Sequence, residues 1–178
     1  MLCIEVPIGP ENWDEETEQF VTETRTLRLE HSLVSLSKWE SKWCKPFLSQ
    51  AGMTPEETLD YIRFMTLNDV DPDIYDGLTK ENVREIVRYI EAPMTATTFS
   101  KDKGKRNREI ITAELIYYWM ISMNIPFECR EWHLNQLLTL IRVCSIKNQP
   151  AKKMSRREIM RRNAALNAER KAKLNSKG

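Results

Sequence analysis

Few residues in this sequence have the type and spacing that metal binding requires. Cys129 and His133 are separated by four positions, so on a helix both side chains would lie on one face and could bind one metal ion. His31 and Cys144 could complete the set. Zinc sites usually contain paired CxxC or HxxxH elements, and none of the four cysteines forms a CxxC pair. We therefore predict a structural or surface role for these side chains, without a bound metal or cofactor.

The same pair, Cys129 and His133, would be the reactive pair of a thiol enzyme. Such a pair needs a third group that orients the histidine and an oxyanion hole, and the sequence marks neither. The chain also lacks the glycine-rich phosphate loops, the HExxH metal motif and the GxSxG nucleophile motif. We therefore predict that the protein is not an enzyme.

A cluster of aspartates superficially resembles a calcium-binding loop. It consists of Asp69, Asp71, Asp73 and Asp76. The glycine and the terminal glutamate of a calcium loop are missing at the required spacing. These carboxylates are therefore expected in a solvated loop.

The net charge of +1 conceals an asymmetry along the chain. Residues 152–178 contain ten Lys or Arg and two Glu, whereas residues 1–151 carry a net charge of −7. A basic tail on an acidic body can steer a partner or fold back onto the body. Three interpretations stay open: a solvated face, docking onto an acidic protein surface, and nucleic-acid contact. The last is the least favoured, because the tail has no aromatic side chain for base stacking.

Aromatic residues are enriched at the centres of protein interfaces. Most Trp and Tyr residues here have core spacing, and Trp39 or Trp43 is the best candidate for an exposed anchor. The predicted partner-binding residues are therefore these two tryptophans and the basic residues of the tail, namely Lys152, Lys153, Arg156, Arg157, Arg161, Arg162, Arg170 and Lys171.

The periodicity of apolar residues predicts the elements that position these side chains. Alternation predicts strands over 2–8 and 20–29, which pair as a hairpin across an acidic loop, Glu11–Glu18. Helical spacing predicts helices that start at Ser32, Thr54 and Thr79, and further helices over 109–123 and 128–147. The helix over 109–123 is apolar nearly all round, which is typical of a central position in a bundle. Ser155 and Glu158 form a capping box for a last helix that ends near Leu174.

The expected fold is therefore α+β and predominantly helical. Residues 1–148 form an N-terminal β-hairpin and a helical bundle, and residues 149–178 form a basic linker and a protruding helix. The longest apolar stretch, 110–123, contains Glu114 and is too short to span a bilayer. The N-terminus lacks the features of a signal peptide, so we expect reduced thiols in a cytoplasm.

Several blocks of the sequence resemble the tail assembly chaperones of long-tailed, siphovirus-type bacteriophages. The resemblance covers nearly the whole chain. The blocks are Leu29–Glu40, Pro93–Thr98, Arg108–Ile121, Asn124–Cys129, Trp132–Cys144 and Lys152–Ser155.

The resemblance implies a chaperone in the cytoplasm of the infected host. Such proteins coat the long helical tape measure protein and keep it soluble until the tail tube polymerises around it. The basic tail could dock acidic stretches of the tape measure or tail-tube protein. The alternatives are a structural virion component, such as a head–tail connector or tail completion protein, and a nucleic-acid-binding regulator that uses the basic tail. The sequence does not give the oligomeric state.

Overall fold

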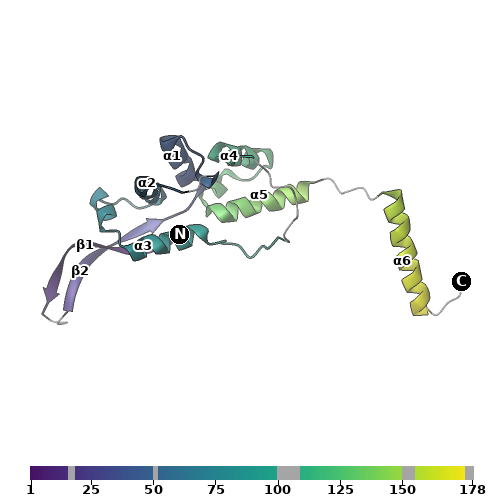
Figure 1. Ribbon diagram of the computed structural model, residues 1–178, viewed down its shortest axis with the longest axis horizontal. Helices are drawn as coiled ribbons and strands as arrows, with labels where there is room; N and C mark the ends of the chain where they lie inside the picture. Colours follow the sequence, from purple (N-terminus) through teal and green to yellow (C-terminus); the bar gives the residue numbers. More distant parts are fainter. Residues whose placement is uncertain (16–18, 50–51, 100–108, 150–154, 175–178) are drawn as a thin grey trace. The chain divides into compact units, whose positions relative to one another are not determined.

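The computed structural model describes residues 1–15, 19–49, 52–99, 109–149 and 155–174 (Figure 1). The chain divides into two units, Met1–Ile146 and Lys147–Gly178, which are described separately below. The predicted class is confirmed, because the described residues form one two-stranded antiparallel sheet and are otherwise mainly helical.

The first unit begins with a long hairpin of strands β1 (Leu2–Asp14) and β2 (Gln19–Leu29). The pairing runs from Leu2 opposite Leu29 to Asp14 opposite Gln19, with an irregularity between Ile8 and Asn12. The strands therefore include 11–14, which the sequence assigned to a loop. The rings of Trp13 and Phe20 meet edge to face with centroids 5.0 Å apart, and this cross-strand contact stabilises the far end of the hairpin.

The rest of the first unit is a chain of helices, and the sequence predicted the starts of the first three α-helices. Thr54 and Glu57 form the predicted capping box, in which the Thr54 amide donates to Glu57 at 2.7 Å. Ser32 and Thr79 also cap the helices that follow them. The α-helices are α1 (Leu33–Trp43), α2 (Pro55–Met65), α3 (Lys80–Glu91), α4 (Ala113–Ser122) and α5 (Leu134–Asn148), with 3₁₀ helices η1 (Phe47–Ser49), η2 (Pro72–Gly77) and η3 (Phe127–Glu131).

Two hydrophobic cores lie on either side of α1. The first joins the base of the hairpin to α1, α2, η2 and α3, and it contains the fully buried Trp39 and Tyr61. The second joins α1 to α4, η3 and α5, and it contains Leu33, Leu36 and Leu134. Because α1 contributes residues to both cores, it connects them.

Helix α4 is not the centre of a bundle, contrary to the prediction from its all-round apolar sequence. Ala113, Ile116 and Met120 are buried, whereas Tyr118 and Ile121 are 63% and 69% exposed. The helix packs with one face only, so an apolar face remains at the surface. Periodicity could not reveal this face, because an all-apolar helix gives no contrast between buried and exposed sides.

The predicted helix over 128–147 is also wrong at its start. Residues 127–131 form η3, and α5 begins only at Leu134. Between them His133 pairs with Ser32 in an isolated bridge, and the Leu134 amide donates to the carbonyl oxygen of His31 at 2.7 Å. These long-range backbone contacts interrupt the helix.

The buried carboxylate of Glu40 connects three segments of this unit. One oxygen accepts from the Phe47 amide at 2.8 Å, and the other accepts from the Ala113 amide at 2.7 Å. Thr112, the residue before α4, makes no side-chain cap. Glu40 therefore caps α4 from α1, where a negative charge also suits the positive end of the helix dipole.

The second unit contains helix α6 (Arg156–Leu174), whose predicted cap is confirmed. The Ser155 amide donates to Glu158 at 2.8 Å, and the Glu158 amide donates to Ser155 at 3.2 Å. Every described side chain of α6 is exposed. Within the described ranges, no helix is both long and apolar enough to cross a membrane.

Replacing Glu40 should destabilise the protein. Glu40→Ala leaves one buried and one half-buried amide without an acceptor, and hydrogen bonds to a charged group contribute about 1.5–3 kcal/mol each. We expect a loss of about 3 kcal/mol in the free energy of unfolding, measured by urea denaturation. Ser41→Ala, on the exposed side of the same helix, should change it by less than about 0.5 kcal/mol. Equal effects of the two substitutions would contradict the capping role.

Candidate functional site

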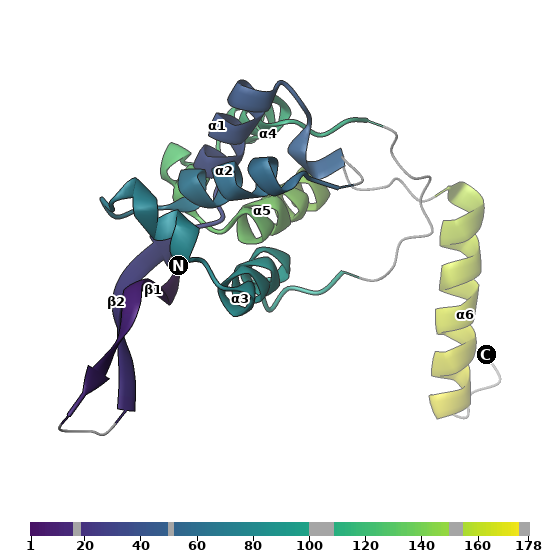
Figure 2. The same ribbon diagram turned by 60° about the vertical axis from the view of Figure 1, so that its left-hand side comes forward.

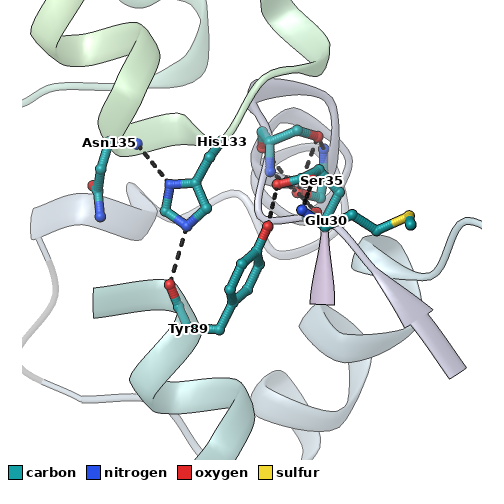
Figure 3. A network of polar contacts seen from close by, with 7 residues as sticks. Glu30, Ser35, Tyr89, His133 and Asn135 are labelled. Carbon is teal, nitrogen blue, oxygen red and sulfur yellow. Dashed lines mark hydrogen bonds and ion pairs between the residues drawn. The ribbon is translucent and has the colours of Figure 1, made fainter. Parts of the chain in front are cut away.

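The two histidines, His31 and His133, lie together in the interior. Their rings meet edge to face with centroids 5.1 Å apart, and the residues are 2% and 3% exposed. Nδ1 of His31 lies 2.5 Å from the Tyr61 hydroxyl. Nε2 of His133 donates to the carbonyl oxygen of Tyr89 at 3.0 Å, while its Nδ1 accepts from the Asn135 amide at 3.3 Å (Figure 3). Both ring nitrogens of His133 are therefore occupied by backbone groups.

Burial keeps this cluster neutral. It lowers the pKa of His31 to about 3, with a smaller contribution from the neighbouring His133, and it also lowers the pKa of His133. The Tyr89 hydroxyl donates to Glu30 at 2.6 Å, and burial followed by this bond raises the pKa of Tyr89. The arrangement joins segments of the fold and keeps both imidazoles uncharged near neutral pH.

Cys129 does not form a reactive pair with His133. The two residues do not share a helix, since Cys129 lies in η3 and His133 precedes α5. Burial raises the pKa of the Cys129 thiol, with a further contribution from Glu128, whereas a nucleophilic cysteine needs a lowered pKa. Because both His133 nitrogens already have partners, no ring nitrogen remains to activate the thiol.

The proposed metal sets and the aspartate cluster have ordinary structural surroundings. Among the described residues, no group of three or more His, Cys, Asp or Glu side chains is arranged to hold a metal ion. Asp71 caps η2 by accepting from the Asp73 amide at 3.2 Å. Neighbouring Asn68 accepts from the Arg28 amide at 2.8 Å and so attaches this loop to the outer edge of β2.

The prediction that Trp39 is an exposed anchor is wrong. Trp39 is completely buried, and its Nε1 donates to the carbonyl oxygen of Glu57 at 2.9 Å, so it joins α1 to α2. Trp43 is half-buried against the first core, with the ammonium groups of Lys42 and Lys45 at 5.6 and 5.7 Å from its ring. Its role as an anchor stays a prediction.

The predicted basic residues divide between described and undescribed parts of the tail. Lys152 and Lys153 lie outside the described residues. The remaining predicted residues, which are Arg156, Arg157, Arg161, Arg162, Arg170 and Lys171, are exposed on α6. Their role in binding a partner stays a prediction.

An apolar groove lies between α2, η2 and α3. Its volume is about 410 Å³, which is in the range of ligand-binding clefts. The side chains of Met53, Leu59 and Val83 contribute to its wall, and none of the three is fully buried. The complete lining is Met53, Pro55, Thr58, Leu59, Ile62, Tyr75, Leu78 and Val83.

Sequence reasoning missed the most exposed aromatic side chains. Trp13 and Phe20 are 54% and 66% exposed at the hairpin tip, and Tyr118 lies on the outer face of α4. The signal for the tip was present, because two aromatic residues flank an acidic segment. The sequence predicts a loop for that segment, so it does not single out the flanking aromatic side chains. No comparable signal marked Tyr118.

Comparisons with known proteins identify no family. No family model, curated protein or solved structure matches this chain. The exposed features of the described residues include an apolar groove, an apolar helix face, an acidic hairpin tip and a basic helix.

The buried histidines make the stability of the protein depend on pH. Since the pKa of His31 falls from 6.5 to about 3 on folding, the unfolded chain binds a proton below pH 6.5 that the folded chain rejects. Stability is complete above this pH and declines as pH falls. We expect His31 to account for about 2 kcal/mol of lost stability between pH 7.5 and 5.

Urea unfolding of His31→Gln across this pH range tests the assignment. The variant should give a flatter dependence of unfolding free energy on pH, by about one proton per molecule at pH 5. Tyr61→Phe keeps the buried imidazole and should retain the wild-type slope. An unchanged slope in His31→Gln would show that other groups cause the pH dependence.

Proposed function

We propose that this chain is a tail assembly chaperone of a long-tailed bacteriophage. In this role it binds the tape measure protein in the host cytoplasm and keeps it soluble while the tail tube polymerises. The resemblance of the sequence blocks supports the identity of the partner. The open apolar groove between α2, η2 and α3 is the observation that supplies a means of binding.

A tape measure protein is a long helical chain whose apolar stripes aggregate unless they are covered. An amphipathic helix binds a groove by inserting apolar side chains spaced three and four residues apart. The groove of this protein is open and lined mainly by apolar side chains, with Met53 at 36% exposure. The exposed Tyr118 and Ile121 of α4 offer a second apolar surface, and adjacent helical turns bring these two side chains together.

The acidic character of the first unit suits the same role. Residues 1–151 carry a net charge of −7, which keeps a complex with an apolar partner dispersed by mutual repulsion. The two histidines and Cys129 are occupied or deactivated by the surrounding structure, as described above. Binding without catalysis is therefore the activity that these residues support.

Charged substitutions in the groove test the proposal. Met53→Glu combined with Leu59→Glu places two carboxylates where an apolar helix would bind. On co-expression with the tape measure protein, we expect the soluble fraction of that protein to fall at least fivefold, since each charge would have to be desolvated. The measurement is the amount of tape measure protein in the supernatant and in the pellet.

Val87→Glu is the matched control for this experiment. Val87 is an exposed apolar residue of α3, and it does not line the groove. This variant should maintain tape measure solubility at the wild-type level. The groove proposal would be rejected if the double variant folded normally by circular dichroism and remained as effective as wild type.

The composition of purified phage particles separates this function from that of a structural virion component. A chaperone leaves the assembly before the particle is complete, so mass spectrometry of purified virions should detect at most traces of this chain. A stoichiometric signal would favour a head–tail connector or tail completion protein instead.

A further inference from the structure

The tip of the hairpin combines negative charge with exposed aromatic rings. Residues 11–23 contain six acidic residues and no Lys or Arg. Among the described side chains there, Glu15 and Glu23 are exposed, and Trp13 and Phe20 are more than half exposed. Both figures show the tip extending away from the helices of its unit (Figures 1 and 2). It is therefore available to another molecule.

The first two turns of α6 have complementary chemistry. They carry Arg156, Arg157, Arg161 and Arg162, together with Ile159 and Met160, which are 45% and 65% exposed. Arginine pairs with carboxylates through two parallel hydrogen bonds, and its flat guanidinium also stacks on aromatic rings. An acidic tip with exposed Trp and Phe presents both kinds of partner at once.

We propose that the hairpin tip of one copy binds the first two turns of α6 in a second copy of this chain. The contact is independent of the groove and goes beyond the proposed chaperone function. In this contact, the partner of the basic helix α6 is the acidic hairpin tip of another copy.

The geometry of the first unit favours a second copy over the chain's own tip. Helix α5 starts beside the base of the hairpin, where the Leu134 amide donates to the His31 carbonyl oxygen. From there α5 and the hairpin run to opposite sides of the unit in both views (Figures 1 and 2). The 11 residues of β2 span about 36 Å and the 15 residues of α5 about 22 Å, so the end of α5 lies on the order of 50 Å from the tip.

The segment between α5 and α6 is too short to cover this distance. Seven residues, 149–155, separate the end of α5 from the start of α6, and even a fully extended chain of that length spans only about 25 Å. The arginine cluster lies in the turns of α6 that are nearest to this connection. It therefore reaches the tip of a neighbouring copy more readily than its own.

This contact joins two different surfaces, so each copy offers one of each kind. Copies then add head to tail and form chains or closed rings, which makes the assembly depend on protein concentration. Because carboxylates and guanidinium groups supply much of the attraction, the assembly should dissociate when salt screens them.

Sedimentation velocity of the full chain tests the proposal. Wild type should sediment faster as its concentration rises at low salt, and as a monomer at about 1 M salt, where the screening length is about 3 Å. Glu15→Lys with Glu23→Lys, and separately Arg156→Glu with Arg161→Glu, should each weaken association at least tenfold. Lys80→Glu with Arg88→Glu changes the charge of exposed α3 residues by the same amount as the α6 variant and should leave association unchanged.

Mixing the two charge-reversed variants provides the decisive result. The tip variant keeps the wild-type basic helix, and the helix variant keeps the wild-type acidic tip. Each variant associates only weakly with itself, but an equimolar mixture should form a dimer through that wild-type pair of surfaces, which sediments faster than either variant alone.

Three results would overturn the proposal. In the first, wild type sediments as a monomer at every concentration at low salt. In the second, both charge-reversed variants associate as strongly as wild type, and in the third, the equimolar mixture of the variants stays monomeric. A monomeric wild type at low salt would indicate that α6 binds a different molecule, such as an acidic partner protein or a nucleic acid. None of these results bears on the groove, because the solubility experiment with Met53 and Leu59 tests that surface separately.

Discussion

The two hydrogen bonds of the Glu40 carboxylate are the constraint on which the first unit depends. They hold the amides of Phe47 and Ala113, which are 7 and 73 residues away in the sequence, against α1. A buried carboxylate is costly unless such donors satisfy it, so its presence specifies where η1 and the start of α4 must lie. With α4 attached in this way, α1 can direct Trp39 into the first core, and Leu33 and Leu36 into the second.

The residues with the greatest potential for catalysis also make structural contacts. His31 and His133 lie where the two cores meet, and backbone groups occupy both nitrogens of His133. Burial raises the pKa of the Cys129 thiol and so makes it less nucleophilic. Polar groups with catalytic potential thus serve to join segments of the fold. What the described residues present at the surface is apolar area and charge.

Charge and apolar area are distributed over separate surfaces. The groove near Met53 and the outer face of α4 are apolar, the hairpin tip is acidic and aromatic, and α6 is basic. Separate surfaces allow separate contacts, so the proposed helical client and the proposed second copy need not compete for one site. The helix α6 has no buried side chain among its described residues, so tertiary packing contributes little to its stability. Its cap and its exposed ion pair of Lys173 with Glu169 are local, which suits a helix that is stabilised further when it binds a partner.

Local signals in the sequence determined the class of the fold and the starts of α2 and α6, because a capping box such as Thr54 with Glu57 involves residues only three positions apart. The charge division between body and tail was equally readable, since charge is a property of composition. Only the tertiary structure decided which apolar residues are buried. Trp39 became core and Tyr118 surface, although both have helical spacing, because burial depends on which elements pack against a face. The start of α5 at Leu134 and the contact between His31 and His133 likewise depend on residues about a hundred positions apart in the sequence. Local periodicity carries no information about such contacts.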